Sequence, residues 1–512
     1  MYLESLPFQI ATDRFTYLGL SIPLNSKSLF KHNFTPLIDK LKTDIEYWRS
    51  LPLSMIGRIN AIKMVSLPRF MYLFQNIPIM LSSSFFKKID SIIMPFIWGY
   101  KTNRIAKSHL QKSKMLGGFS LPVFQHYYWA TNLRALIYWQ NQSPQVSSIA
   151  PKWLQFESQA VKNSSLSALL FSKENPSDIV GDNFILENSL QILKQVKRVL
   201  TVPELSVHSP ICFNHNFIPS QSDTAFTYWR EKGLITFADL YIDNHFAAFN
   251  ELKEAFSLPQ AHFFRYLQVR HFVQNTFNNF ESLPQEHCFY ALMKQHPNTK
   301  HLISKFVSLF SKSSIPSTNH IKSSWEVDLG VELSDEIWNE GLRRIHSGSI
   351  NSRLQLVQFK VMHRLHYSKV KMNKMYPTVS DICDRCSTSR GTLGHTFWSC
   401  PRIAAFWKDI FAWYSRVYHI HIDPDPLTVL FGCSEASLSL PYSIQQTIML
   451  GTLIAKRIIL SEWKTSVIPS FNRWLNEFVS LIYLERLRCN KLNGRATFEY
   501  IWGPISAHLD LT

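Results

Sequence analysis

The chain has 512 residues, which is enough for about three domains at roughly 150 residues each. Lysine and arginine number 54 and aspartate and glutamate 37, so the formal net charge is +17, which favours a polyanionic partner such as nucleic acid or an anionic membrane surface. Apolar residues make up 46% of the chain, which excludes a disordered protein, and the mean hydropathy of -0.08 excludes a membrane protein.

No targeting or membrane-spanning segment is apparent in the sequence. The first residues, MYLESLPFQIATDR, lack the basic region and apolar core of a secretory signal. The most apolar late segment is interrupted by Lys456 and Arg457, and no run of about 18 uncharged apolar residues occurs. Seven cysteines are too few for a disulfide framework in a chain of this length. We therefore expect an intracellular protein without a transmembrane helix, cytoplasmic, with a nuclear location left open.

Most of the chain has the pattern of α-helices. It contains only 16 glycines, and apolar residues recur at spacings of three and four. Residues 1–24 differ, because FTYLGLSIPL alternates in polarity, is rich in β-branched or aromatic residues and has Gly19 at its centre. The sequence thus predicts a mainly α, multi-domain helical protein with a short N-terminal β-hairpin.

Composition indicates where the helical regions divide. The polar segment NQSPQVSSIAP at 141–151 is typical of a linker, and SKSSIPSTNHIKSS at 311–324 is a second candidate. We therefore expect a first helical domain at 25–140, a helical connecting region at 141–340 and a C-terminal domain at 341–512.

Positive charge is concentrated in two blocks. Residues 1–140 contain 17 lysines and arginines against 6 acidic residues, and no acidic residue occurs between Asp90 and Glu157. Residues 341–380 contain eight basic residues and no acidic one. An ordinary solvated surface intersperses both signs, so we favour nucleic-acid contact for both blocks over a merely solubilising surface.

The sharpest local motif is ICDRCSTSRGTLGHTFWSC, a C-x2-C-x8-H-x4-C array formed by Cys383, Cys386, His395 and Cys400. Two cysteines three residues apart can turn around one ion, and a later histidine and cysteine complete the four ligands of tetrahedral zinc. The alternative is four unrelated residues, with the cysteines buried as small apolar side chains. We favour a zinc-knuckle-like element whose metal is structural, because four protein ligands leave no open position.

The segment before this array, NSRLQLVQFKVMHRLHYSKVKMNK at 351–374, has the pattern of one helix with Asn351 or Ser352 as N-cap. At 100° per residue its basic residues form one stripe, beside an apolar stripe that can anchor the helix on a core. The stripe consists of Arg353, Lys360, Arg364 and Lys371. We expect the metal to hold this helix against the C-terminal domain.

One apparent motif is excluded as a catalytic site. Phe237, Ala238 and Asp239 resemble the start of the F/Y-A-D-D motif of reverse transcriptases, but the next residue is Leu240. One carboxylate cannot bridge a pair of metal ions, and no adjacent aspartate pair occurs in the chain. We interpret Asp239 as a surface or capping residue.

Several segments, in a fixed order, resemble the reverse-transcriptase polyprotein of LINE-type (non-LTR) retrotransposons of the LINE-one clade. FTYLGLSI at 15–22 resembles the segment that closes the palm. Two longer segments resemble the thumb: LPLSMIGRINAIKMVSLPRFMYLFQNIPI at 51–79 and FIWGYKTNRIAKSHLQKSKMLGGFSLPVFQHYYWA at 96–130. QFKVMHRLHYSKVKM, GTLGHTFWSC and DPDPLTVLFG resemble the family's C-terminal segment.

The resemblance implies a palm-end hairpin at 1–24, a thumb-like domain at 25–140 and a C-terminal zinc-bearing domain. The family's catalytic palm would precede Tyr17, so the resemblance implies no polymerase activity for this chain alone. The family's thumb cradles the template and primer duplex, and its C-terminal region helps to hold RNA. By resemblance, the thumb's contacts fall to Arg58, Lys63, Arg104, Lys107, Lys112 and Lys114.

Three functions therefore stay open from the sequence. The first is a nucleic-acid-binding fragment that contacts RNA, an RNA/DNA hybrid or a DNA duplex mostly through phosphates, without a membrane partner. The second is a domesticated helical scaffold or protein-interaction module that no longer binds nucleic acid. The third is an enzyme, if a longer reading frame supplies the palm. We favour the first.

Overall fold

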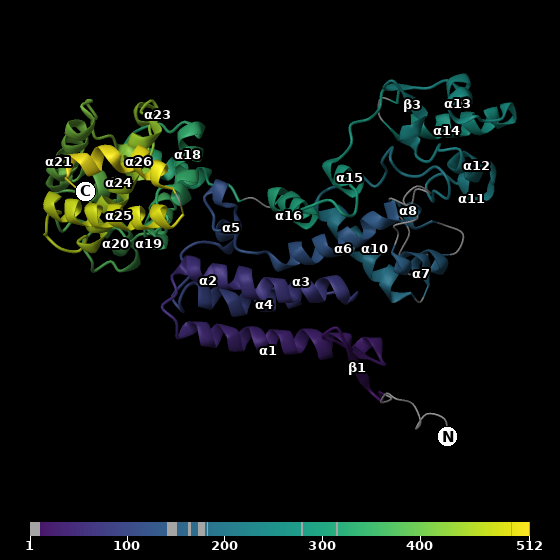
Figure 1. Cartoon of the computed structure of the whole chain (residues 1–512), viewed down its shortest axis with the longest axis horizontal. Coiled ribbons are helices and arrows are strands. Elements are labelled where there is room, and N and C mark those ends of the chain that lie inside the picture. Colours follow the sequence, from purple (N-terminus) through teal and green to yellow (C-terminus); the bar gives the residue numbers. More distant parts are fainter. Residues whose placement is uncertain are drawn as a thin grey trace. The chain divides into compact units, whose positions relative to one another are not determined.

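The computed structural model describes residues 11–140, 151–161, 165–172, 180–181, 183–277, 280–313, 316–492 and 494–510. Helices make up most of this part of the chain, and its strands form two small two-stranded sheets (Figure 1). The prediction of a mainly α protein with a short N-terminal β-hairpin is therefore confirmed.

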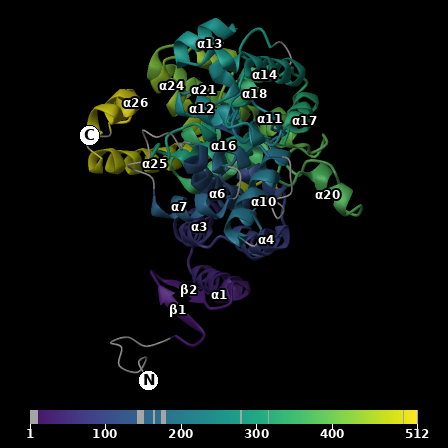
Figure 2. The same cartoon turned by 90° about the vertical axis from the view of Figure 1, so that its right-hand side faces the viewer.

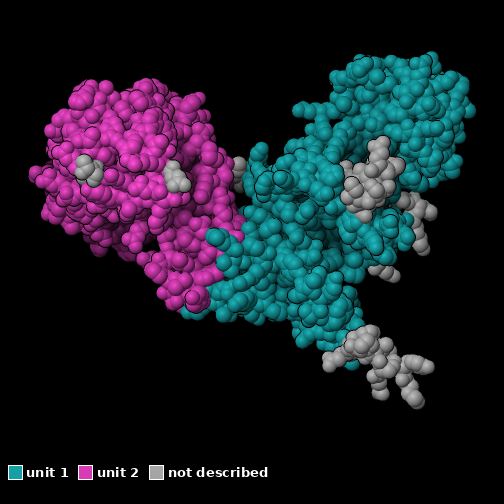
Figure 3. Space-filling model, in the orientation of Figure 1, with its two compact units in different colours: residues 1–46, 64–93, 123–314 teal, residues 47–63, 94–122, 315–512 magenta. Residues whose placement is uncertain are grey.

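The chain forms two compact units (Figure 3). Unit 1 contains residues 1–46, 64–93 and 123–314, and unit 2 contains residues 47–63, 94–122 and 315–512. Each unit thus combines segments from distant parts of the sequence. The domain boundaries expected from the sequence stay predictions, because they were drawn from composition and resemblance rather than from contacts.

The two predicted linkers fare differently. The segment 141–151 lies outside the described residues except for Pro151. The segment 311–324 is mostly helical, because α16 (Leu302–Ser313) ends inside it and α17 (Asn319–Leu329) begins inside it. Helices thus occupy most of that predicted linker, and one of the chain's crossings between the units falls within 311–324.

The N-terminal hairpin follows directly from its sequence. Strands β1 (Arg14–Tyr17) and β2 (Leu20–Pro23) are antiparallel, with Tyr17 opposite Leu20. Leu18 and Gly19 have φ of 49° and 79°, and positive φ at both positions is what a type I′ turn requires. The hairpin lies beside α1 (Leu29–Arg49), because the side chain of Asn33 bonds both the N–H and the carbonyl of Ser21, at 2.9 and 2.8 Å (Figure 2).

Aromatic side chains form the first core of unit 1. Phe34 of α1 lies 6.2 Å from Phe74 of α3 (Leu67–Asn76) and 5.6 Å from Phe85 of α4 (Ser83–Ile97), measured between ring centroids. Phe74 lies 5.4 Å from Tyr128 of α6 (Phe124–Gln140). Buried aromatic pairs of this kind contribute stability beyond their buried area.

A second core of unit 1 gathers buried residues between Ile211 and Val273. It includes Trp229, which is fully buried, and the apolar residues of a short hairpin, β3 (Tyr241–Ile242) and β4 (His245–Phe246), pack against it. The other helices that the structure describes in unit 1 are α7 (Lys152–Ala160), α8 (Leu166–Leu169), α10 (Phe184–Val199), α11 (Pro219–Ser222), α12 (Ala225–Glu231), α13 (Phe249–Phe256), α14 (Phe263–Thr276) and α15 (Cys288–Met293), with 3-10 turns at Ser26–Ser28, Phe237–Leu240 and Gln260–His262.

Unit 2 is built around α24 (Tyr442–Ser461), which is buried on nearly all sides. Gly451 has no side chain, which leaves room beside the helix for Tyr414 and Trp474. The indole N–H of Trp474 donates to the Gly451 carbonyl at 2.9 Å. The other helices that the structure describes in unit 2 are α2 (Met55–Ala61), α5 (Lys107–Gln111), α17, α18 (Asp335–Ser347), α19 (Ser352–Met362), α20 (Lys369–Met375), α21 (Pro401–Tyr418), α22 (Pro426–Phe431), α23 (Glu435–Leu438), α25 (Phe471–Lys491) and α26 (Arg495–His508). Two π-helical turns, Ile62–Ser66 and His395–Ser399, and the 3-10 turn Lys114–Leu116 complete this list, and the first π-helical turn continues into unit 1.

The single basic helix expected at 351–374 is wrong. Asn351 caps its start as predicted, but α19 ends at Met362 and α20 begins only at Lys369. Arg364 has φ of 51°, and the N–H of Leu365 bonds the Lys360 carbonyl at 2.8 Å. These are the features of a Schellman helix end, here without the usual glycine. The four predicted basic residues therefore do not form one stripe on one helix.

Candidate metal centre and basic cluster

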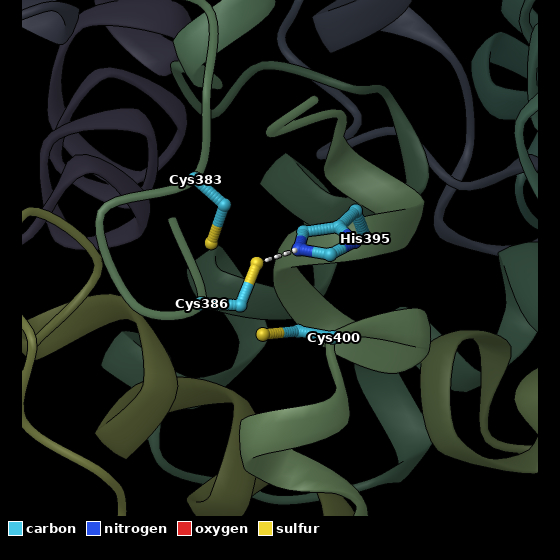
Figure 4. A group of neighbouring side chains, drawn as sticks. All are labelled: Cys383, Cys386, His395 and Cys400. Atoms are coloured by element: carbon cyan, nitrogen blue, oxygen red, sulfur yellow. Dashed lines mark hydrogen bonds between the residues drawn. The ribbon is translucent and has the colours of Figure 1, made fainter. Parts of the chain in front are cut away.

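Cys383, Cys386, His395 and Cys400 come together as the sequence predicts. One ligand atom from each residue lies within 4.8 Å of the ligand atoms of the other three, and Cys386 Sγ is 3.4 Å from His395 Nε2 (Figure 4). In a tetrahedral site with metal–sulfur bonds of about 2.3 Å, the sulfurs are about 3.8 Å apart. Small side-chain rotations therefore suffice, and the group can hold a metal ion.

Local backbone geometry explains how the first two cysteines meet. The loop that carries them is closed by a bridge between Ile382 and Arg390, and the Cys383 N–H donates to the Ser389 carbonyl at 2.9 Å. Ser387 turns the chain back with φ of 57°. Gly391 is required beside this loop, because a Cβ there would lie 2.8 Å from the side chain of Lys369.

The other two ligands lie at helical turns. His395 begins the π-helical turn His395–Ser399, and its N–H donates to the Thr392 hydroxyl at 3.0 Å. Cys400 is the residue before α21, an 18-residue helix. The N-terminus of a long helix stabilises negative charge, which offsets part of the cost of a buried thiolate at this position.

The electrostatics of the cluster favour a cation among the sulfurs. Burial raises the pKa of Cys386, but hydrogen bonds from Thr388, from the Ser389 N–H and from His395 lower it more, to about 5. Burial, together with the negative charge of the other two cysteines, raises the pKa of Cys400 to about 11. Three neighbouring thiolates repel one another, so a divalent cation stabilises the fully deprotonated set.

Two carboxylates connect this loop to neighbouring helices. The buried carboxylate of Asp328, on α17, accepts from the Gly394 N–H at 2.9 Å and from the Arg364 guanidinium at 2.7 Å. Asp384, inside the loop, pairs with Lys369 of α20 at 2.9 Å. The positions of Arg364 and of α20 are thus coupled to the Cys/His loop.

Two aromatic residues, Phe397 and Trp398, lie inside the array. Phe397 is fully buried, and its carbonyl accepts from the Trp407 indole at 2.9 Å, so its ring is not exposed for stacking on a base. Trp398 is half-buried.

Five basic side chains of unit 2 form what we call the basic cluster. The Arg104 guanidinium lies 4.3 Å from the ring centroid of Tyr367 and donates to the Leu365 carbonyl at 3.4 Å. Lys371 Nζ lies 5.6 Å from the centroid of the same ring. Burial and the nearby charges of Arg104 and Lys101 lower the pKa of Lys360. The basic cluster consists of Lys101, Arg104, Arg353, Lys360 and Lys371.

The basic cluster carries uncompensated charge. Within the part of the chain that the structure describes, none of its members forms an ion pair with a carboxylate. Burial, then the charges of Arg104 and Arg364, lower the pKa of Lys371, which shows that these cations repel one another. The two basic blocks of the sequence thus contribute to one positively charged surface in unit 2.

The remaining predicted contacts differ in how available they are. Arg364 pairs with Asp328 and stacks over Trp325 at 4.3 Å, and Lys112 is only 7% exposed. Arg58 donates to the Ile97 carbonyl at 3.3 Å. Lys63 is half-buried. Burial lowers its pKa most, and the charge of the nearby, exposed Lys114 lowers it further. Lys107, on α5, is half-buried.

Sequence reasoning missed three contributors to this region. Lys101 lies in the acid-free stretch after Asp90, which was the signal available for it. Tyr367 and Asp328 gave no signal, because their importance depends on contacts with Arg104 and Arg364 that only the fold creates.

Asp239 is a capping residue, as expected. Its carboxylate accepts from the N–H groups of Ile235 and Thr236, at 3.0 and 2.7 Å, and from the Thr236 hydroxyl at 3.0 Å. Among the helices that the structure describes, none combines the length and apolar character needed to cross a membrane. No known protein-family model matches the sequence.

Proposed function

We propose that this chain binds nucleic acid through the basic cluster, as the C-terminal, non-catalytic part of a LINE-type reverse transcriptase. RNA, an RNA/DNA hybrid and a DNA duplex are the candidate partners, contacted mostly at phosphates. The proposal rests on one observation, the convergence of unpaired cations from two separate basic blocks on Tyr367. Phosphates offer the charge and the multiple acceptors that such a surface lacks.

The chain alone is proposed to be inactive as a polymerase. Phosphoryl transfer by a two-metal mechanism needs carboxylates that hold both ions, and the sequence contains no adjacent aspartate pair. Its role is to hold a strand or duplex.

Binding is tested by fluorescence anisotropy with a labelled RNA/DNA hybrid. Affinity should fall on the order of a few hundred-fold between about 50 and 200 mM salt, as expected for about five phosphate contacts. The double variant Arg104→Ala/Lys371→Ala should reduce the salt slope by about two. Arg134→Ala/Lys194→Ala removes the same charge from exposed positions of unit 1 and should leave the slope nearly unchanged. Binding that is absent or indifferent to salt favours the protein-interaction alternative.

The metal is proposed to be zinc with a structural role. Three sulfurs and one imidazole nitrogen in a closed set of four are the ligands and the number that zinc takes in structural sites. Elemental analysis of the purified protein should give about one zinc per chain. Cys386→Ser should lose this metal on dialysis against a weak chelator, whereas Cys288→Ser, at an exposed cysteine outside the cluster, should keep it. Equal zinc content in both variants contradicts the assignment.

A further inference from the structure

A pocket beside the basic cluster has the composition of a nucleotide site. It has a volume of about 320 Å³ and lies between the segment Pro52–Met55 and the face of α19, both in unit 2. Arg353 and Lys360, two turns apart on α19, line it and supply its charge. The remaining lining residues are Pro52, Leu53, Ser54, Met55, Leu356, Val357 and His366, so no carboxylate lines it.

The pocket combines cationic with apolar side chains. Leu53, Leu356 and Val357 are only partly buried, so their side chains offer apolar surface to a ligand. Ser54 also lines it, and its hydroxyl caps α2 and lies 3.1 Å from the Ser352 hydroxyl. A ligand that fits has an anionic group attached to a flat, largely apolar body.

Charge in the pocket belongs to Arg353 and Lys360. Burial, and then the charge of Lys360, lower the pKa of His366 to about 3, so this ring is neutral near pH 7. Lys360 is crowded by Arg104 and Lys101, and no carboxylate of the described residues pairs with it. An anion bound beside Lys360 relieves this repulsion.

We propose that this pocket takes one unpaired nucleotide of a bound strand, with its phosphate against Arg353 and Lys360 and its base between the apolar side chains of Leu53 and Leu356. The inference rests on the proposed function and adds a preference for single-stranded over fully paired nucleic acid. A volume near 320 Å³ is at the small end for ligand pockets and fits one nucleotide rather than a duplex. The shared chemistry is a nucleoside phosphate. A strand is favoured over a free nucleotide because Arg104 and Lys371 continue the positive surface beyond the pocket.

Filling the pocket without changing its charge tests this inference. Leu356→Trp and Leu53→Trp narrow it from opposite walls, and Val327→Trp, at an 86% exposed position of α17 outside this pocket, is the matched control. Affinities are measured for a single-stranded 12-mer RNA and for the blunt duplex with its complement, after circular dichroism has established folding. Two filling variants keep the test valid if one of them misfolds.

The filled variants should bind the single strand about tenfold more weakly, which corresponds to loss of one base contact, while duplex affinity stays within about twofold. Val327→Trp should match the wild type with both ligands. An unchanged or tighter single-strand affinity in the filled variants overturns the pocket but leaves the proposed function standing. A wild type that binds neither ligand overturns the proposed function itself.

A titration with adenosine monophosphate separates the two sources of a nucleoside phosphate. At millimolar concentrations of adenosine monophosphate, wild-type protein should bind this nucleotide no more tightly than the filled variants do. If filling the pocket abolishes binding of the free nucleotide but leaves single-strand affinity unchanged, the pocket is a free-nucleotide site and the strand-bound inference is wrong.

Discussion

Lys456 is the residue whose environment differs most from that of an ordinary lysine. Its side chain is fully buried in α24, and its ammonium donates to Gln358 Oε1 at 2.6 Å and to the Leu430 carbonyl at 3.1 Å. Burial lowers its pKa to about 7, because the charged form is desolvated. Because the partners described for this buried amine are an amide and a carbonyl oxygen, the stability of unit 2 should depend on pH.

The sign of this dependence follows from proton linkage. Between the folded pKa of about 7 and the unfolded value of 10.5, the unfolded chain binds more protons at Lys456, so its contribution to stability rises with pH and is lost as pH falls through 7. The free energy of unfolding of the wild type, relative to Lys456→Met, should increase by about 2 kcal/mol between about pH 7 and 9. Urea denaturation at both pH values measures this difference, and parallel pH profiles for the two proteins contradict it.

Gly451 shows how one residue limits the packing of an element. A Cβ at this position would collide with the Tyr414 hydroxyl and would lie 3.0 Å from Trp474 Cζ2. The Tyr414 hydroxyl is fixed, because it donates to the Thr447 carbonyl at 2.7 Å. Neither aromatic ring has room to move, since both are fully buried.

We therefore expect Gly451→Ala to lower the free energy of unfolding by about 1–3 kcal/mol, although alanine has the higher helix propensity. Gly503, in α26, is the matched control, because its nearest contact for a Cβ is the end of the Glu499 side chain at 3.6 Å. Gly503→Ala should stabilise the protein by about 0.5–1 kcal/mol. Thermal and urea denaturation of both variants check the opposite signs.

Elements that depend on neighbouring residues were predictable, and elements that depend on distant residues were not. The N-terminal hairpin needs only its alternating strands and the Leu18–Gly19 turn, and Asn351 starts its helix with its own side chain. The end of α19 is different, because a left-handed arginine costs roughly 1–2 kcal/mol. Arg364 tolerates this conformation while bound to Asp328 and Trp325, which the local sequence does not reveal.

At the scale of the whole molecule, the sequence identified the candidate metal ligands but not how the basic blocks meet. The Cys/His spacing restricts the four ligands to one short loop, so their proximity was predictable. Arg104 and Leu365 are 261 residues apart, and no local pattern indicates that they are in contact. Net charge predicts a polyanionic partner, but only the tertiary fold determines which basic residues share one surface.

The metal centre and the basic cluster should be energetically coupled through α20. Its Val370 N–H donates to the Gly391 carbonyl at 3.3 Å, and Lys369 pairs with Asp384, which lies between two of the cysteines. Lys371, on the same helix, belongs to the basic cluster. Without the metal the Cys/His loop should be free to move, and Lys371 should then lose its fixed position.

Cys386→Ser should therefore weaken binding of an RNA/DNA hybrid roughly three- to tenfold and reduce the salt slope by about one, the effect of losing a single phosphate contact. Lys371→Ala should have the same effect while zinc content stays at about one per chain. Because both substitutions remove the same contact, the double variant should bind as either single variant does. Anisotropy titrations over a range of salt concentrations measure all four proteins. Additive losses in the double variant would mean that the metal centre and Lys371 act independently.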